Sequence, residues 1–109
     1  VRAVCQWYKA AGVTAVGAPL TSPFFLFVAT HEIGHQFNAR HVQNNACNRN
    51  DATAVEPGSG STQMSYAGIC APNVQNIGDN YFNGISLEEI GGFLDSDADA
   101  CAVKTAIPA

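Results

Sequence analysis

The sequence feature that most limits what this chain can fold into is the run from His31 to His41, which contains all three histidines of the protein. It begins with the pattern His-Glu-x-x-His at His31, Glu32 and His35. In an α-helix, residues four apart differ by about 40° around the axis and lie about 6 Å apart along it. His31 and His35 would therefore point the same way from successive turns, and their imidazoles could share one metal ion. Glu32 is rotated by about 100°, so it suits contact with a metal-bound water better than a place among the ligands.

The third histidine, His41, can join the first two only if the helix ends before it, because a continuing helix would turn its side chain away. Asn38 is the best candidate for the bend, since asparagine readily takes the left-handed conformation that ends a helix. Three histidines and one water form the open, catalytic type of zinc site, for which Glu32 would be the general base. The alternative is a chance match, because a lone helical histidine is more often a surface or core residue.

Composition limits the class of protein. The chain has 109 residues, 47% of them hydrophobic and 13% charged, which fits one domain at most and excludes a disordered tail. The net charge of −4 leaves no basic stripe, so nucleic acid is not an expected partner. The apolar run Phe24–Ala29 is too short to span a membrane. Because the chain begins with Val1 instead of Met, we interpret it as a processed or excised piece.

The four cysteines, Cys5, Cys47, Cys70 and Cys101, contain no CxxC pair. This spacing argues against a zinc ribbon and a thioredoxin-type site. Buried free thiols and a separate structural zinc site remain open. We favour two disulfides, and with them an oxidising, extracellular setting.

Local patterns predict a helix through the histidine motif. Residues 1–20 contain short apolar runs that predict strand fragments or an irregular ribbon. Ser22 is a suitable helix cap and Pro23 fits the first helical position. Phe24–Ala29 is apolar on every side, which predicts a buried helix. Gly34 costs about 1 kcal/mol against alanine inside a helix, so we expect a close neighbour there.

A second helix is predicted over residues 85–94, with Ser86 as its cap and Glu89 at the capping-box position. The following Asp95–Asp99 lacks the glycine and glutamate of a calcium loop and predicts a solvated acidic end. Two stretches are rich in turn-forming residues: residues 44–51 predict an exposed loop, and residues 56–62 predict a second loop.

With the third histidine and the single methionine in view, the chain resembles the metzincin zinc peptidases. The resemblance is greatest to the adamalysin/reprolysin-type metalloproteases, particularly their secreted bacterial relatives, and it covers nearly all of the chain. His31, Glu32, His35 and His41 match the motif HExxHxxGxxH of that clan. Met64 matches its Met-turn, the turn that forms the floor of the zinc site.

The chain departs from the family pattern at two positions. Asn38 stands where glycine is usual, and the helix-ending property of asparagine accommodates this. Gln63 replaces the usual apolar residue before the methionine, which affects local packing. Tyr66 lies at the position from which a tyrosine of astacin- and serralysin-like metzincins reaches the zinc or the oxyanion. Reprolysin-type enzymes do not generally depend on this tyrosine, so packing is the expected role of Tyr66 and contact with the zinc or the oxyanion is the alternative.

The resemblance implies an α+β fold, with residues 1–109 forming a single partial catalytic domain. This domain would be the C-terminal portion of a metzincin catalytic domain, with the active-site helix, the Met-turn and the C-terminal helix but without most of the upper sheet lobe. It also implies the disulfide pairing Cys5–Cys101 and Cys47–Cys70.

The function implied is that of a secreted endopeptidase with one catalytic Zn²⁺, which cleaves protein or peptide substrates with a zinc-activated water. His31, His35 and His41 would be the metal ligands, and Glu32 the general base. The alternative is an inactive zinc-binding fragment that needs the missing N-terminal part of the same domain. Neither nucleic acid nor a membrane span is expected.

Overall fold

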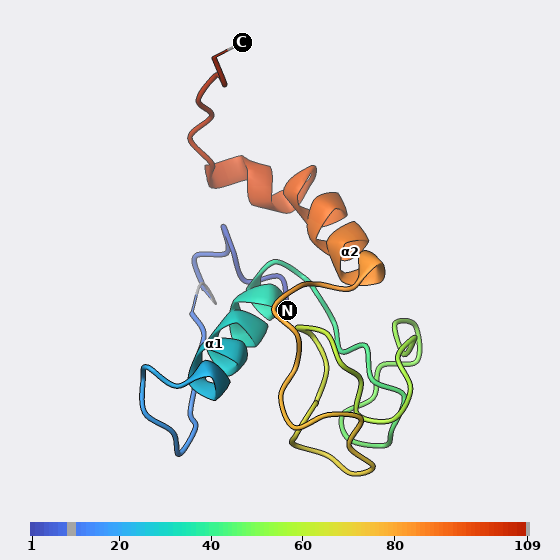
Figure 1. Ribbon diagram of the computed structural model, residues 1–109. Coiled ribbons are helices and arrows are strands. Elements are labelled where there is room, and N and C mark those ends of the chain that lie inside the picture. Colours follow the sequence, from blue (N-terminus) through green and yellow to red (C-terminus); the bar gives the residue numbers. More distant parts are fainter. Residues whose placement is uncertain (9–10, 109) are drawn as a thin grey trace.

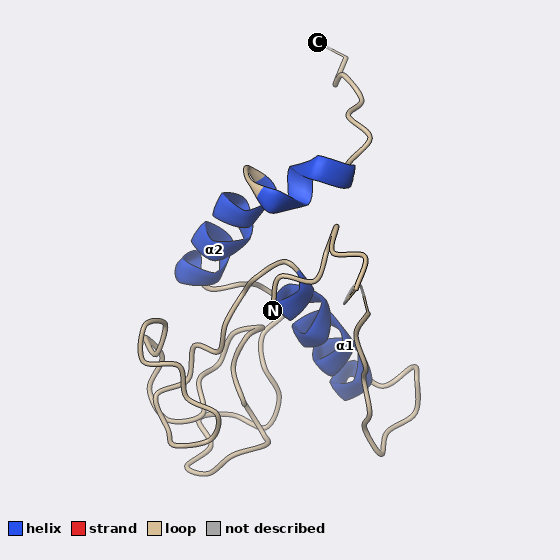
Figure 2. Ribbon diagram, turned by 180° about the vertical axis from the view of Figure 1, so that it is seen from behind, coloured by secondary structure: helices blue, strands red, loops and turns tan. Residues whose placement is uncertain are grey.

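Helices are the regular elements of the computed structural model, which describes residues 1–8 and 11–108 (Figure 1). They are α1 (Pro23–Gln36), α2 (Gly84–Leu94) and the short 3-10 helix η1 (Asp97–Cys101). Long irregular segments join them, and the described residues contain no strand (Figure 2). In place of the β-sheet of the predicted α+β fold, the described residues have one isolated parallel bridge, between Gln43 and Glu56. No helix in this part of the chain is long and apolar enough to cross a membrane.

The N-terminal segment is the irregular ribbon, so the alternative prediction of strand fragments is wrong for residues 1–8 and 11–20. The reason lies in its hydrogen bonds. The backbone nitrogen of Arg2 donates to the carbonyl oxygen of His35 at 3.0 Å, and that of Ala3 donates to Gln36 at 2.9 Å. These bonds satisfy carbonyl groups at the end of α1 that have no partner within the helix. The segment thus pairs with a helix end instead of a neighbouring strand.

Helix α1 begins and ends as its sequence predicts. The Ser22 side chain accepts a hydrogen bond from the backbone nitrogen of Phe25 at 3.0 Å, and Pro23 occupies the first turn. The cap residue Phe37 ends the helix, and Asn38 follows in the left-handed conformation with φ 80°. The bend expected before His41 is therefore present.

The prediction that Phe24–Ala29 is buried on every side is wrong. Phe27 is buried in this run, whereas the Leu26 side chain is 58% exposed. The irregular region 39–83 lies along one side of α1, and the segment that precedes the helix in the chain runs along the other side (Figure 1). Gly78 packs so closely on Phe27 that a Cβ atom at this glycine would overlap the phenyl ring. The buried face of α1 is thus the face that carries Phe27 and His31.

The core is small and lies where α2 meets the irregular region. Ala39, Val42 and Met64 are fully buried, and three partly buried side chains pack against them, Phe82, Ile85 and Ile90. Asn83 caps the start of helix α2, and its side chain accepts from the backbone nitrogen of Ile85 at 3.1 Å. The predicted cap Ser86 is inside the helix and fully buried, so that prediction is wrong.

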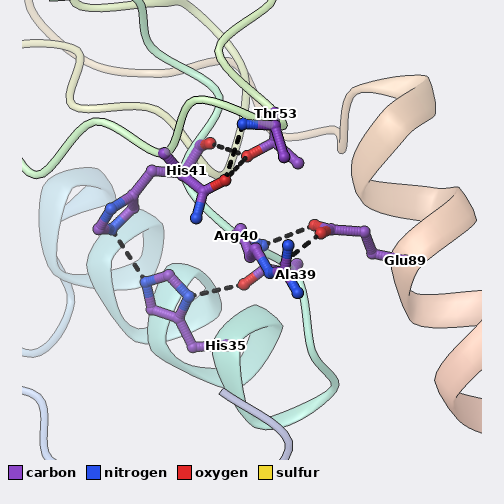
Figure 3. A network of polar contacts seen from close by, with 8 residues as sticks. His35, Ala39, Arg40, His41, Thr53 and Glu89 are labelled. Atoms are coloured by element: carbon purple, nitrogen blue, oxygen red, sulfur yellow. Dashed lines mark hydrogen bonds and ion pairs between the residues drawn. The ribbon is translucent and has the colours of Figure 1, made fainter.

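Glu89 has a different partner from the one expected of a capping box. Its side chain accepts from the backbone nitrogen of Arg40 at 2.8 Å and forms an ion pair with the Arg40 guanidinium at 3.4 Å. It therefore ties α2 to the residue that precedes His41 (Figure 3). At the acidic end, Asp97 and Asp99 lie within η1 and form ion pairs with Arg2 and Lys104.

Two disulfides join the irregular segments. Cys5 is bonded to Cys101 and Cys47 to Cys70, which is the pairing that the family resemblance implied. The first connects the N-terminal segment to η1. The second connects the loop after His41 to the segment after Met64. Both restrict the unfolded chain, and such restriction stabilises a fold with little regular structure.

Glu56 anchors the loop that precedes Met64, a role that its loop sequence did not predict. The carboxylate accepts four hydrogen bonds at 2.5 to 3.0 Å, from the hydroxyl and backbone nitrogen of Thr62, the backbone nitrogen of Ser61 and the side chain of Asn83. Burial alone raises the pKa of Glu56, but these donors outweigh it and lower the pKa below its usual value of 4.5.

Replacing Glu56 by glutamine should therefore destabilise the fold, since an amide NH₂ would face hydrogen-bond donors. We expect Glu56→Gln to lower the free energy of unfolding at pH 7 by about 2 kcal/mol, measured by urea denaturation. Because folding lowers the pKa, the carboxylate contributes its stability above the unfolded pKa and loses it as the pH falls through the folded pKa. The difference from wild type should shrink in acid. Glu88→Gln, at an exposed position of α2, is the control, and equal stability of both variants would contradict the anchor.

Candidate metal centre

Helix α1 and the bend after it bring the three histidines together. His31 and His35 lie one turn apart on α1, with ring centroids 4.7 Å apart. His41 follows the left-handed Asn38, and its ring centroid is 5.2 Å from that of His31 and 4.7 Å from that of His35. One nitrogen from each ring lies within 4.8 Å of the others, so the three side chains could hold a metal ion.

Backbone carbonyl groups fix the orientation of each ring. Nδ1 of His31 lies 2.9 Å from the backbone oxygen of Gln63, and Nδ1 of His35 lies 2.7 Å from that of Ala39. Nδ1 of His41 lies 2.8 Å from the backbone oxygen of Asn48. A carbonyl oxygen only accepts, so each Nδ1 carries the proton of a neutral imidazole. The Nε2 atoms are then left with lone pairs. This is the tautomer in which an outer partner orients a histidine ligand.

The chemistry of these lone pairs fits a metal ion. Nε2 of His35 and Nε2 of His41 are 3.0 Å apart (Figure 3). With both protons on Nδ1, no hydrogen atom lies between the two Nε2 atoms, and their lone pairs repel. A cation bound by both removes that repulsion. Neutral imidazole nitrogen is among the preferred ligands of zinc.

Burial keeps the three rings neutral. Desolvation, followed by the charge of His35, lowers the pKa of His31 from 6.5 to about 3. Burial also lowers the pKa of His35 and the pKa of His41. The rings are therefore unprotonated at neutral pH, as metal ligands must be.

Glu32 lies beside the histidines without being part of their cluster. It is partly buried on α1 and lines, together with His35, a cavity of about 350 Å³ against residues 1–3 and 11–13. The negative charge of Glu32 favours the protonated form of His41 and so opposes the lowering of the His41 pKa by burial. A second cavity of about 210 Å³ adjoins His35 and His41. His35 thus borders both cavities, which a ligand can enter.

Met64 and Tyr66 of the irregular region lie close to the histidine cluster. Met64 is fully buried, and its sulfur packs directly against Gly34 of α1. The Tyr66 ring centroid is 4.6 Å from that of His41 and 5.9 Å from that of His31. The Tyr66 hydroxyl oxygen accepts a hydrogen bond from the Asn48 side chain at 2.9 Å.

Sequence reasoning missed the residues that orient the histidines. Gln63 is buried, its carbonyl oxygen binds His31, and its side-chain amide donates to the carbonyl oxygen of Phe27 at 2.5 Å. The hydroxyl of Thr53 donates to the carbonyl oxygen of His41 at 2.6 Å. At Gln63 the sequence did carry a signal, because a polar residue in place of the usual apolar one indicates a buried hydrogen bond. Ala39 and Asn48 act through backbone oxygens, which any residue type carries.

A His-Glu-x-x-His helix with a third histidine after a bend forms a three-histidine cluster that could hold a metal ion. Comparison with protein families gives the class of protein. Residues 1–91 match the family described as metallo-peptidase family M12B, reprolysin-like, and the chain belongs to this family. A peptidase family implies protein or peptide substrates. Searches of curated proteins and of solved structures gave no significant match.

The first test of the centre is metal content. Loss of a residue that only hydrogen-bonds to a metal ligand weakens metal binding by up to about 100-fold. We expect His35→Ala to weaken zinc binding by more than this, because it removes a ligand itself. Zinc per protein after dialysis measures this. Thr30→Ala, at an exposed position of the same helix, should retain the metal. One zinc per molecule of the His35→Ala protein would refute the assignment of the ligand.

A second test concerns the contact beneath the centre. A Cβ atom at Gly34 would overlap the Met64 sulfur and lie 3.0 Å from the Phe82 ring. Because Met64 is fully buried, we expect Gly34→Ala to destabilise the fold by about 1 to 2 kcal/mol, despite the gain in helix propensity. Gly91→Ala in α2 meets no atom within 4 Å and should be stabilising. Thermal unfolding distinguishes the two, and a stabilised Gly34→Ala protein would disprove the close contact.

Proposed function

We propose that this chain is a secreted zinc-dependent endopeptidase of metzincin type, with residues 1–109 forming one partial catalytic domain. The observation that carries the proposal is that one ring nitrogen from each of His31, His35 and His41 lies within 4.8 Å of the others, while Glu32 shares a cavity with His35. Membership in the reprolysin-like family supports peptide-bond hydrolysis as the reaction. The two disulfides support an extracellular setting.

His31, His35 and His41 would hold the zinc ion through Nε2. When bound there, zinc supplies the positive charge that lowers the pKa of a water molecule and polarises the scissile carbonyl group. The carbonyl partners of the three Nδ1 atoms keep the rings in the required tautomer during this chemistry. Met64 gives the cluster a packed floor because its fully buried side chain lies against Gly34.

Glu32 is the general base in this proposal. Its carboxylate takes the proton of the attacking water and delivers it to the amide nitrogen that leaves. Its place on α1, one residue after His31 and in the same cavity as His35, supports the role. The open cavity leaves room for a peptide group beside the carboxylate.

Tyr66 has a supporting catalytic role. Its ring lies against His41 and His31, at the edge of the histidine cluster. From there the hydroxyl donates a hydrogen bond to the carbonyl oxygen of the substrate as that oxygen gains negative charge.

The exposed apolar side chains favour a second candidate. Val13 is 81% exposed, Leu20 72% and Leu26 58%. Such a surface also suits a zinc-binding module that cleaves peptides only when further polypeptide covers it. Assay of the chain on casein, with and without a chelator, separates the two functions. Activity that the chelator abolishes supports the peptidase, and bound zinc without activity supports the module.

The general base gives the sharpest test of mechanism. Glu32→Gln should retain zinc, since it removes no ligand, and should lower kcat by at least about 100-fold, since it removes the proton acceptor. Casein hydrolysis and zinc content are measured on the same preparation. Glu88→Gln, exposed on α2, is the matched control. Turnover like that of wild type in the Glu32→Gln protein would end the proposed mechanism.

A further inference from the structure

Asn48 makes hydrogen bonds to two different groups of the metal centre. Its backbone oxygen accepts from Nδ1 of His41 at 2.8 Å, and its side-chain amide donates to the Tyr66 hydroxyl oxygen at 2.9 Å. The His41 and Tyr66 rings are themselves in contact, with centroids 4.6 Å apart and planes inclined by 65°. One residue of the loop after His41 therefore touches both a metal-ligand candidate and the proposed oxyanion donor.

We propose that Asn48 is a positioning residue, which holds His41 and Tyr66 in one arrangement and keeps the Tyr66 hydroxyl as a donor toward the substrate. This inference rests on the proposed peptidase function and adds to it a residue that acts through another. Asn48 lines the cavity of about 210 Å³ next to His35 and His41, so it lies at the mouth of the site.

The direction of the hydrogen bond carries the chemical argument. A side-chain NH₂ group only donates, so Asn48 uses a lone pair of the phenolic oxygen. The hydrogen atom of the Tyr66 hydroxyl is then free for another acceptor. In peptide hydrolysis that acceptor is the substrate oxygen, which gains negative charge. An aspartate at position 48 would reverse the bond and take the phenolic hydrogen for itself.

The surrounding loop supports a fixed position for Asn48. Its backbone is left-handed, with φ 47°, a conformation that asparagine tolerates better than most residues. The preceding Cys47 is bonded to Cys70, beyond Tyr66 on the chain. The carbonyl oxygen of Cys47 accepts from the side chain of the fully buried Gln43 at 2.7 Å. The Asn48 side chain is exposed, but the residue before it is anchored by these two contacts.

The first experiment needs neither metal nor turnover. Asn48→Gly keeps the left-handed backbone and the carbonyl oxygen but removes the side-chain amide. In NMR spectra of the metal-free protein, we expect the Tyr66 ring signals to shift and the His41 ring to keep its Nδ1–H tautomer. Asn44→Ala is the control, since Asn44 is exposed in the same loop and its side chain accepts from Arg49. Unchanged Tyr66 signals in Asn48→Gly would overturn the inference.

The second experiment is a double-mutant cycle on the zinc-loaded protein. Tyr66→Phe removes the oxyanion donor and should lower kcat by about 100-fold. Asn48→Gly should lower kcat by about tenfold with KM and zinc affinity unchanged, because it disturbs only the aim of the hydroxyl. If Asn48 acts through Tyr66, the double variant is no slower than Tyr66→Phe alone. Asn48→Asp should lose at least as much kcat as Asn48→Gly despite its similar shape.

Outcomes of the cycle separate this inference from the proposed function. Multiplicative losses in the double variant, or a kcat like that of wild type in Tyr66→Phe, overturn the positioning role and leave Glu32 as the base. Full activity of Glu32→Gln overturns the peptidase mechanism instead. In a chain without measurable turnover, the NMR comparison still decides whether Asn48 positions Tyr66.

Discussion

The metal centre depends on three hydrogen bonds between imidazole Nδ1 atoms and backbone carbonyl oxygens. The carbonyls belong to Ala39, Asn48 and Gln63, which lie on three separate parts of the irregular region. Each bond favours one tautomer, and burial lowers the pKa of all three rings. Together they leave the Nε2 lone pairs free, and those of His35 and His41 lie 3.0 Å apart. The irregular region thus supplies the carbonyl groups that orient the three rings, and α1 supplies none of them.

That region has little regular structure, so other contacts must stabilise it. The Cys47–Cys70 disulfide, the Glu56 carboxylate with its four donors, and the buried Met64 connect its turns to one another and to α1. Precise loops on a rigid helix are a common basis for catalytic sites. In this protein the rigid element is α1, and the loop that carries Asn48 is fixed by its neighbour Cys47.

Local sequence rules predicted α1 well. The Ser22 cap, the bend at Asn38 and the close neighbour of Gly34 are all present, because each depends on a few adjacent residues or on one missing side chain. The same rules failed at residues 1–8 and 11–20, since the end of α1 offers the first of these segments hydrogen bonds that a strand pattern does not reveal. They also failed at Ser86, because the helix already begins at Gly84, where the Asn83 side chain accepts from the backbone nitrogen of Ile85.

The sequence by itself determined the set of histidines and the carboxylate beside them, since the spacing of His31, Glu32 and His35 on a helix is a local geometric fact. It also determined that the chain bends before His41, through the conformational preference of Asn38. The tertiary structure decided which carbonyl oxygens orient the rings and that Tyr66 and His41 meet at Asn48. These contacts join residues that are distant along the chain, and their geometry depends on how the loops pack, which no local pattern encodes.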